Sequence, residues 1–194
     1  MPLPLRCRCG RLQGEVALEG AYTRATCYCR DCRAFAKFLG GEGIANAQGG
    51  TDIVPMDPAG LRFTAGDEQL ACMSMSPRGL LRWYAACCRT PVGNTGRDAK
   101  QSYVGVITAC IDAPEATLAA QAGPRDRIAL FRKHARGKVA ATPLRLVSGG
   151  LSIMAHVVAA RLRGRRDAVF FDAQGAPIRA PHVVSKQERE VLQS

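Results

Sequence analysis

The 194-residue sequence predicts a mainly β fold of short antiparallel strands, followed by a C-terminal extension of mixed α and β structure. Three observations support this class. Short stretches of alternating apolar and polar residues occur between residues 12 and 107, and glycines separate them at turn spacing. Eight of the nine cysteines lie before residue 89, seven of them in close groups, which is typical of a small sheet held together by bound zinc.

The first part of the chain contains four clear strand patterns and one helix pattern. The predicted strands are residues 12–18, 61–64, 80–84 and 103–107. Residues 31–39 predict a short helix, which ends where Gly40 and Gly41 follow it.

The composition changes to alanine- and arginine-rich sequence near Pro114, and we place a domain boundary there, giving segments 1–111 and 112–194. The second segment predicts helices at 113–122, 125–136 and 149–162, a hairpin at 168–178 and a capped helix at 185–192. We expect this extension to cover the first domain or to form a homodimer.

The charge pattern argues against several kinds of partner. The net charge is +11, and its densest basic run is Arg161, Arg163, Arg165 and Arg166. No aromatic residue is interleaved with this run, so a solvated helix end is favoured over a nucleic-acid surface. The apolar stretch 146–162 is interrupted by Ser148, Ser152, His156 and Arg161, and we expect no membrane span.

The odd number of cysteines and the absence of a signal-like stretch in the sequence predict a reducing, cytoplasmic location with free thiols. The thiol spacing then predicts metal binding. Cys27, Cys29 and Cys32 place three thiolates within six residues, which fills three positions of a tetrahedral Zn²⁺ and leaves the fourth for water or substrate. Isolated Cys72 and Cys110 are more simply buried free thiols.

The residues around Cys27, Cys29 and Cys32 suggest how a substrate would be held. Arg30 and Arg33 would stabilise the thiolates and receive an anionic substrate group. Phe35 is either a wall of the substrate pocket or a core residue. Uncoordinated thiols or a redox-active pair are the alternatives to zinc; we favour zinc, because C-x-C occurs twice within 23 residues.

The arrangement resembles the glutathione-dependent formaldehyde-activating enzyme family, which shares its zinc domain with centromere protein V. Cys7-Arg8-Cys9-Gly10 matches the first motif of that family, and Cys27-Tyr28-Cys29-Arg30-Asp31-Cys32 matches the second. The segment from Arg82 to Pro91 matches the third only in part. Aligned on Thr90-Pro91, it has Cys88 at one family cysteine, Ala85 at the other and Arg89 at the family glycine.

The resemblance covers residues 5–110 and implies a β-tent-like domain with two zinc sites. A structural zinc would be held by Cys7, Cys9 and Cys88, with Cys87 or another ligand in place of Ala85, or would be lost. The zinc on Cys27, Cys29 and Cys32 would be catalytic. The implied function is that of a carbon–sulfur lyase acting on a thiol adduct of a small carbonyl, of the S-hydroxymethylglutathione type, with glutathione as the thiol partner. The alternative is a non-enzymatic zinc module for protein or nucleic-acid interaction.

Overall fold

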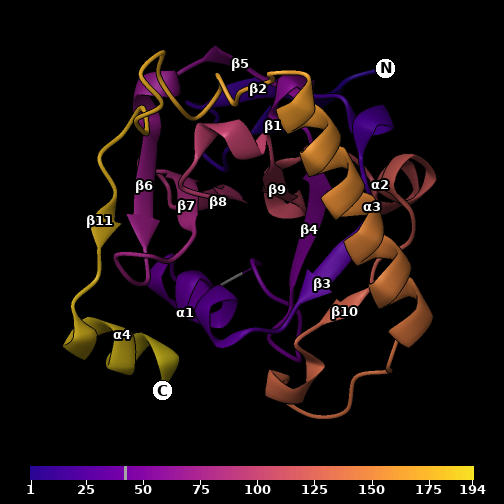
Figure 1. Cartoon of the computed structure of the whole chain (residues 1–194). Helices are drawn as coiled ribbons and strands as arrows, with labels where there is room; N and C mark the ends of the chain where they lie inside the picture. Colours follow the sequence, from indigo (N-terminus) through magenta and orange to yellow (C-terminus); the bar gives the residue numbers. More distant parts are fainter. Residues whose placement is uncertain (42) are drawn as a thin grey trace.

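Two β-sheets and four α-helices make up the computed structural model of the protein, which describes residues 1–41 and 43–194 (Figure 1). A mixed sheet of eight strands has the order β10-β3-β4-β9-β8-β7-β6-β11, and a smaller antiparallel sheet has the order β1-β2-β5. The strands are β1 Leu3–Arg6, β2 Gln13–Val16, β3 Ala25–Cys27, β4 Thr51–Met56, β5 Leu61–Ala65, β6 Leu70–Ser74, β7 Leu81–Ala85, β8 Thr90–Thr95, β9 Val104–Ile107, β10 Ala129–Leu130 and β11 His182–Val183. The sheet-rich class predicted from the sequence is therefore confirmed.

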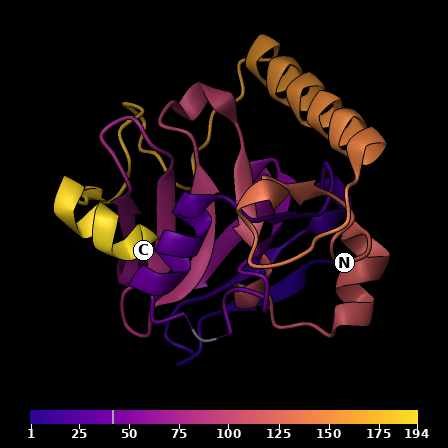
Figure 2. The same cartoon turned by 90° about the horizontal axis from the view of Figure 1, so that it is seen from below.

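The four helices lie around the two sheets (Figure 1). They are α1 Arg30–Phe38, α2 Glu115–Ala122, α3 Pro143–Leu162 and α4 Lys186–Gln193. Helices α1 and α4 pack side by side at one end of the molecule, whereas α3 runs along the outside (Figures 1 and 2). The predicted capping box of the last helix is present, because the Ser185 side chain and the Glu188 side chain each bond the other residue's backbone N–H.

The core has two parts. The larger part surrounds Trp83, which is fully buried, donates a 2.9 Å hydrogen bond to Thr95 Oγ1 and packs against Phe170. The smaller part lies around α1 and includes Phe35, Ile53 and Met73. Because α1 buries one face in this second cluster, its first turn is held rigidly at the end of β3.

The extension is built into the same sheet as the first segment. Strand β10 pairs with β3 at one edge of the large sheet, and β11 pairs with β6 at the other edge. Phe170 and Phe171 are buried in the larger core cluster. Residues 112–194 therefore add a strand at each edge of the large sheet.

Two helix predictions in the extension need correction. Residues 125–136 do not form a helix: they contain β10 and a 3-10 turn, because Thr26 N and Tyr28 N take the carbonyls of Ile128 and Leu130 as hydrogen-bond acceptors. Helix α3 begins at Pro143, six residues earlier than predicted, since proline is favoured in the first helical turn. By length and composition alone, α3 is long and apolar enough to cross a membrane, and its most apolar window has a mean hydropathy of 1.3. The sequence predicted no membrane span in residues 146–162, because polar residues interrupt that stretch.

Candidate metal centres

The first candidate centre joins two hairpin regions that are far apart in the sequence. Cys7 and Cys9 follow β1, and Cys87 and Cys88 lie in the turn between β7 and β8; their four sulfurs all lie within 4.8 Å of one another. The Sγ–Sγ distances are 3.5 Å for Cys7 to Cys9, 3.7 Å for Cys7 to Cys87, 3.3 Å for Cys9 to Cys87 and 3.9 Å for Cys87 to Cys88.

These distances fit a tetrahedral zinc site. Four sulfurs at Zn–S distances of about 2.3 Å lie about 3.8 Å apart. The observed sulfur separations bracket this value and are far longer than a disulfide bond of about 2.05 Å. All nine cysteines are free thiols. The four thiols could therefore hold a metal ion, with one ligand pair from each of two hairpins.

Cys87 completes this cluster in the place expected for Ala85, which is fully buried in β7 away from the four sulfurs. The residue after the two adjacent cysteines, Arg89, has the left-handed φ of 57°. The Arg89 N–H donates to Ala85 O at 2.8 Å and closes the turn. Arg89 thus adopts a conformation that costs about 1 kcal/mol for a residue other than glycine.

The surroundings of Cys88 favour a thiolate. The Arg8 backbone N–H donates to Thr90 Oγ1 at 3.0 Å, and Thr90 Oγ1 lies 3.2 Å from Cys88 Sγ. Burial opposes ionisation, but hydrogen bonds from Thr90 and from the backbone at Cys9 outweigh it and lower the pKa of Cys88 to about 6. A thiol that ionises near neutrality is ready to bind a metal.

The second candidate centre is formed by the junction between β3 and α1. Cys27 ends β3, Cys29 is the N-cap of α1, and Cys32 lies in its first turn. Their sulfurs also lie within 4.8 Å of one another, and Cys29 Sγ accepts a 3.3 Å hydrogen bond from the Cys32 N–H. The positive end of a helix dipole stabilises thiolates at this position. Among the described residues, no fourth cysteine, histidine or carboxylate joins this cluster.

A buried arginine accompanies the three sulfurs, and the sequence did not single it out. Arg82, on β7, is only 3% exposed, and its Nη1 lies 3.7 Å from Cys32 Sγ and 3.1 Å from Asn94 Oδ1. The pKa of Cys32 lies well below its ordinary value, because hydrogen bonds from Cys27 and Cys29 and the charge of Arg82 favour its thiolate. A zinc ion with three thiolates has a net charge of −1, so Arg82 would neutralise the centre.

The residues predicted to hold a substrate lie in different environments. Phe35 is 1% exposed in the smaller core cluster, with the Arg82 guanidinium 5.4 Å from its ring centre. Arg33 donates to His134 O at 2.5 Å and lines a hollow of about 370 Å³ together with Lys37 and Arg136. Arg30, in the first turn of α1, is exposed.

The remaining cysteines fit their expected role as bystanders. Cys72 and Cys110 are buried, and burial raises the pKa of each thiol to about 12. Tyr103 was not singled out as a site residue, because the pattern of residues 103–107 predicted only a strand. Burial, together with negative charge on Cys27 and Cys32, raises its pKa to about 12, which keeps Tyr103 neutral on the side of the second centre.

Comparisons with known proteins add a family but no activity. A search of curated proteins found no match. The crystal structure of a Rhodobacter sphaeroides protein is 18% identical, with a TM-score of 0.44, and the alignment covers 63% of this chain and 99% of that one. The family model of DUF6151, described as a family of unknown function, matches residues 1–170 and so spans both predicted segments. The chain therefore belongs to the DUF6151 family.

Proposed function

We propose that this protein is a zinc-dependent, carbon–sulfur lyase-like protein of the glutathione-dependent formaldehyde-activating type. The observation that supports this most directly is the second centre, where three thiols and one buried cation converge without a fourth ligand among the described residues. A site with three protein ligands and an open position is the form that catalytic zinc sites take. The first centre, with four thiols, would then be structural, and its metal ion would hold the two hairpins of a tent-like fold together.

Each residue near the second centre has a role in this proposal. Cys27, Cys29 and Cys32 would hold the metal, and Arg82 would balance their charge. When bound, zinc would lower the pKa of a thiol or water at its open position and hold it for addition to a small carbonyl. Arg30, together with the cationic hollow formed by Arg33, Lys37 and Arg136, would receive the carboxylates of a thiol such as glutathione. Phe35 would keep the Arg82 guanidinium in place through its ring face.

Zinc stoichiometry tests the two centres directly. Elemental analysis of the purified full chain should give two zinc ions per molecule, and Cys29→Ser should lose one of them. Cys72→Ser is the matched control, because it removes a buried thiol outside both clusters and should keep two ions. Two zinc ions in a folded Cys29→Ser protein would contradict the assignment of the second centre.

The reaction is tested separately, with glutathione and formaldehyde as probes. Exchange between the free species and their adduct, followed by NMR, should be faster with the zinc-loaded protein than in buffer. The increase should disappear in Cys29→Ser and persist in Cys72→Ser. If the wild-type protein binds two zinc ions but the exchange rate equals that in buffer, the lyase proposal is wrong and the alternative, a non-enzymatic zinc module, is favoured.

A further inference from the structure

Helix α3 turns its small and polar residues toward the protein. Gly149 and Ala160 are its buried positions, and a side chain at Gly149 would collide with Ile128. On the same face, the Ser152 hydroxyl donates to Tyr22 O at 3.4 Å, and the His156 ring stacks on Tyr22 at 4.3 Å. The helix is therefore attached to the body through a contact made of small and polar residues together with the half-buried Ile153 and Val157.

The opposite face of α3 exposes six large apolar side chains to solvent. They recur every three or four residues and so form one stripe along the helix, which projects from the body in Figure 2. Their exposed fractions range from 47% to 85%. The stripe consists of Leu144, Val147, Leu151, Met154, Val158 and Leu162. Only 11% of the most apolar window of the helix is buried. An exposed apolar stripe of this length marks a surface that binds something.

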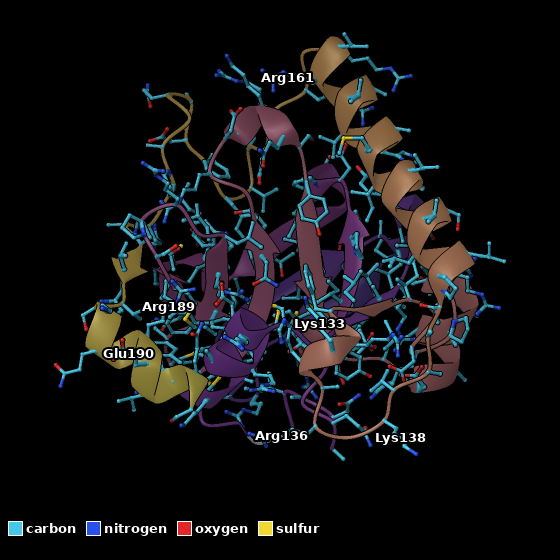
Figure 3. The ribbon with its side chains drawn as sticks, turned by 60° about the horizontal axis from the view of Figure 1, so that its bottom comes forward. Lys133, Arg136, Lys138, Arg161, Arg189 and Glu190 are labelled. Atoms are coloured by element: carbon cyan, nitrogen blue, oxygen red, sulfur yellow. The ribbon has the colours of Figure 1, made fainter. Side chains whose placement is uncertain are left out.

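The chain segment that contains the stripe, between Asp126 and Asp167, carries only positive charge. Residues 127–166 contain ten lysines and arginines and no aspartate or glutamate. Arg161 lies at one end of α3, and Lys133 and Lys138 lie toward the other end (Figure 3). The basic residues at the C-terminal end, Arg161, Arg163 and Arg166, are exposed. The stripe therefore lies between two cationic ends.

The exposed apolar stripe and the cationic ends together favour one partner among a second copy of the chain, a nucleic acid and a lipid surface. A second copy of the chain would bring cationic ends against cationic ends in either a parallel or an antiparallel pair of α3 helices, which is repulsive. A nucleic acid would match the charge but would leave six apolar side chains in contact with phosphates or water. An anionic lipid surface matches both features, because it accepts apolar side chains between acyl chains and cations at its headgroups.

The connections of α3 fix its orientation. Before the helix, Thr142 Oγ1 accepts from the Ala129 N–H of β10; after it, Arg165 pairs with Asp57 at 2.9 Å. Since both ends return to one folded body, the helix can lie in the plane of a membrane but cannot cross it. Next to its first turn, Phe131 is 58% exposed and lines a hollow of about 450 Å³ with Arg132 and Lys133. An aromatic ring beside two cations suits the interface between acyl chains and headgroups.

We propose that α3 is a membrane-surface helix that binds bilayers containing anionic phospholipids, through its exposed apolar stripe and the cations at its two ends. The proposal is independent of the zinc centres. It assigns to the extension the role of attaching the protein reversibly to a lipid surface.

Vesicle co-sedimentation of the 194-residue chain tests this inference. The probes are vesicles of phosphatidylcholine alone and of phosphatidylcholine mixed with phosphatidylglycerol. The protein should sediment with the mixed vesicles and remain in solution with the neutral ones, and added salt should weaken binding. Leu151→Glu should abolish sedimentation. Leu80→Glu is the matched control, because Leu80 is 49% exposed in the β6–β7 turn, and this variant should bind like the wild type.

A second variant separates charge from apolar contact. Replacing Arg161 and Arg163 by glutamine should weaken binding by roughly fivefold for each cation removed, since each contributes about 1 kcal/mol near an anionic surface. Equal binding to neutral vesicles, or binding by Leu151→Glu at the wild-type level, would overturn the proposal. A dimer in the absence of lipid that Leu151→Glu dissociates would instead assign the stripe to a second copy. Duplex DNA binding that Leu151→Glu leaves intact, without vesicle binding, would assign the cations to nucleic acid.

Discussion

Arg82 offers the sharpest test of the second centre, because a buried cation should influence metal binding without being a ligand. In Arg82→Met, Cys32 loses the guanidinium that lies 3.7 Å from its sulfur, and Asn94 Oδ1 loses its 3.1 Å donor. A hydrogen bond to a charged group contributes about 1.5–3 kcal/mol. Since about 1.4 kcal/mol corresponds to tenfold in affinity, we expect zinc to bind the second centre roughly ten- to a hundredfold more weakly.

Competition with a chromogenic chelator measures this change for both centres at once. Among the described residues, the hydrogen bonds of the Arg82 side chain go to Cys32 and Asn94 and not to the four-cysteine centre, which should keep its affinity and so serves as an internal reference. Because the thiolate of Cys32 is partly stabilised by Arg82, the variant should also need a higher pH for zinc binding at the second centre.

Two control variants keep the interpretation clear. Arg82→Lys retains the charge and should lose less affinity than Arg82→Met. Asn94→Ala removes the other partner of Arg82, in an equally buried place, but leaves the cation beside Cys32, so its zinc affinity should change little. A folded Arg82→Met protein whose second centre binds zinc with the wild-type affinity would refute the role assigned to Arg82.

Three further predictions concern stability, measured as the free energy of unfolding in urea. Burial raises the pKa of Asp167 from 3.8 to about 6, so the folded state favours its protonated form. The free energy of unfolding should therefore fall by about 3 kcal/mol as the pH rises through this range. The variant Asp167→Asn should remove that fall. A wild-type curve that is flat over this range would contradict the assignment. Asp52→Ala should cost about 3 kcal/mol, because Arg24, fully buried and 2.6 Å from Asp52, loses its main partner; a loss below about 1 kcal/mol would show that Glu115 compensates. Gly66→Ala should lower the free energy of unfolding clearly more than Gly10→Ala. Both glycines have positive φ, but only at Gly66 would the new Cβ lie 1.9 Å from a backbone oxygen. Equal losses of stability in the two variants would exclude that clash.

Much of the first domain could be predicted from the sequence because its signals are local. The observed strands β2 and β9 lie within the residues predicted from alternating patterns, and β5 and β7 each end one residue later than predicted. Helix α1 begins one residue before the predicted start. The other strands escaped prediction, since segments of two to six residues without a clear alternation carry little pattern. β8 is one example, buried at every position. β10 was predicted as helix, because residues 125–136 have helical composition while their actual hydrogen bonds are made with β3, about a hundred residues away.

The same division applies to the candidate sites. Cys27, Cys29 and Cys32 could be grouped from the sequence because their covalent spacing alone brings their sulfurs close together. The substitution of Cys87 for Ala85 stayed open, since it depends on the φ of Arg89 and on the approach of two separate hairpins. Arg82 carried no sequence signal, because only the packing of β7 beneath α1 places it beside Cys32.

The sequence by itself determined the donor atoms and the positive charge of this protein: closely spaced thiols bind metals, and the arginines of residues 127–166 are there in any fold. Only the tertiary structure decided which thiols meet, which cation balances them, and which face of α3 meets solvent. The physical reason is range. Spacing along the chain fixes what neighbouring residues can do together, whereas burial and pairing across a sheet depend on contacts between residues that are far apart in sequence.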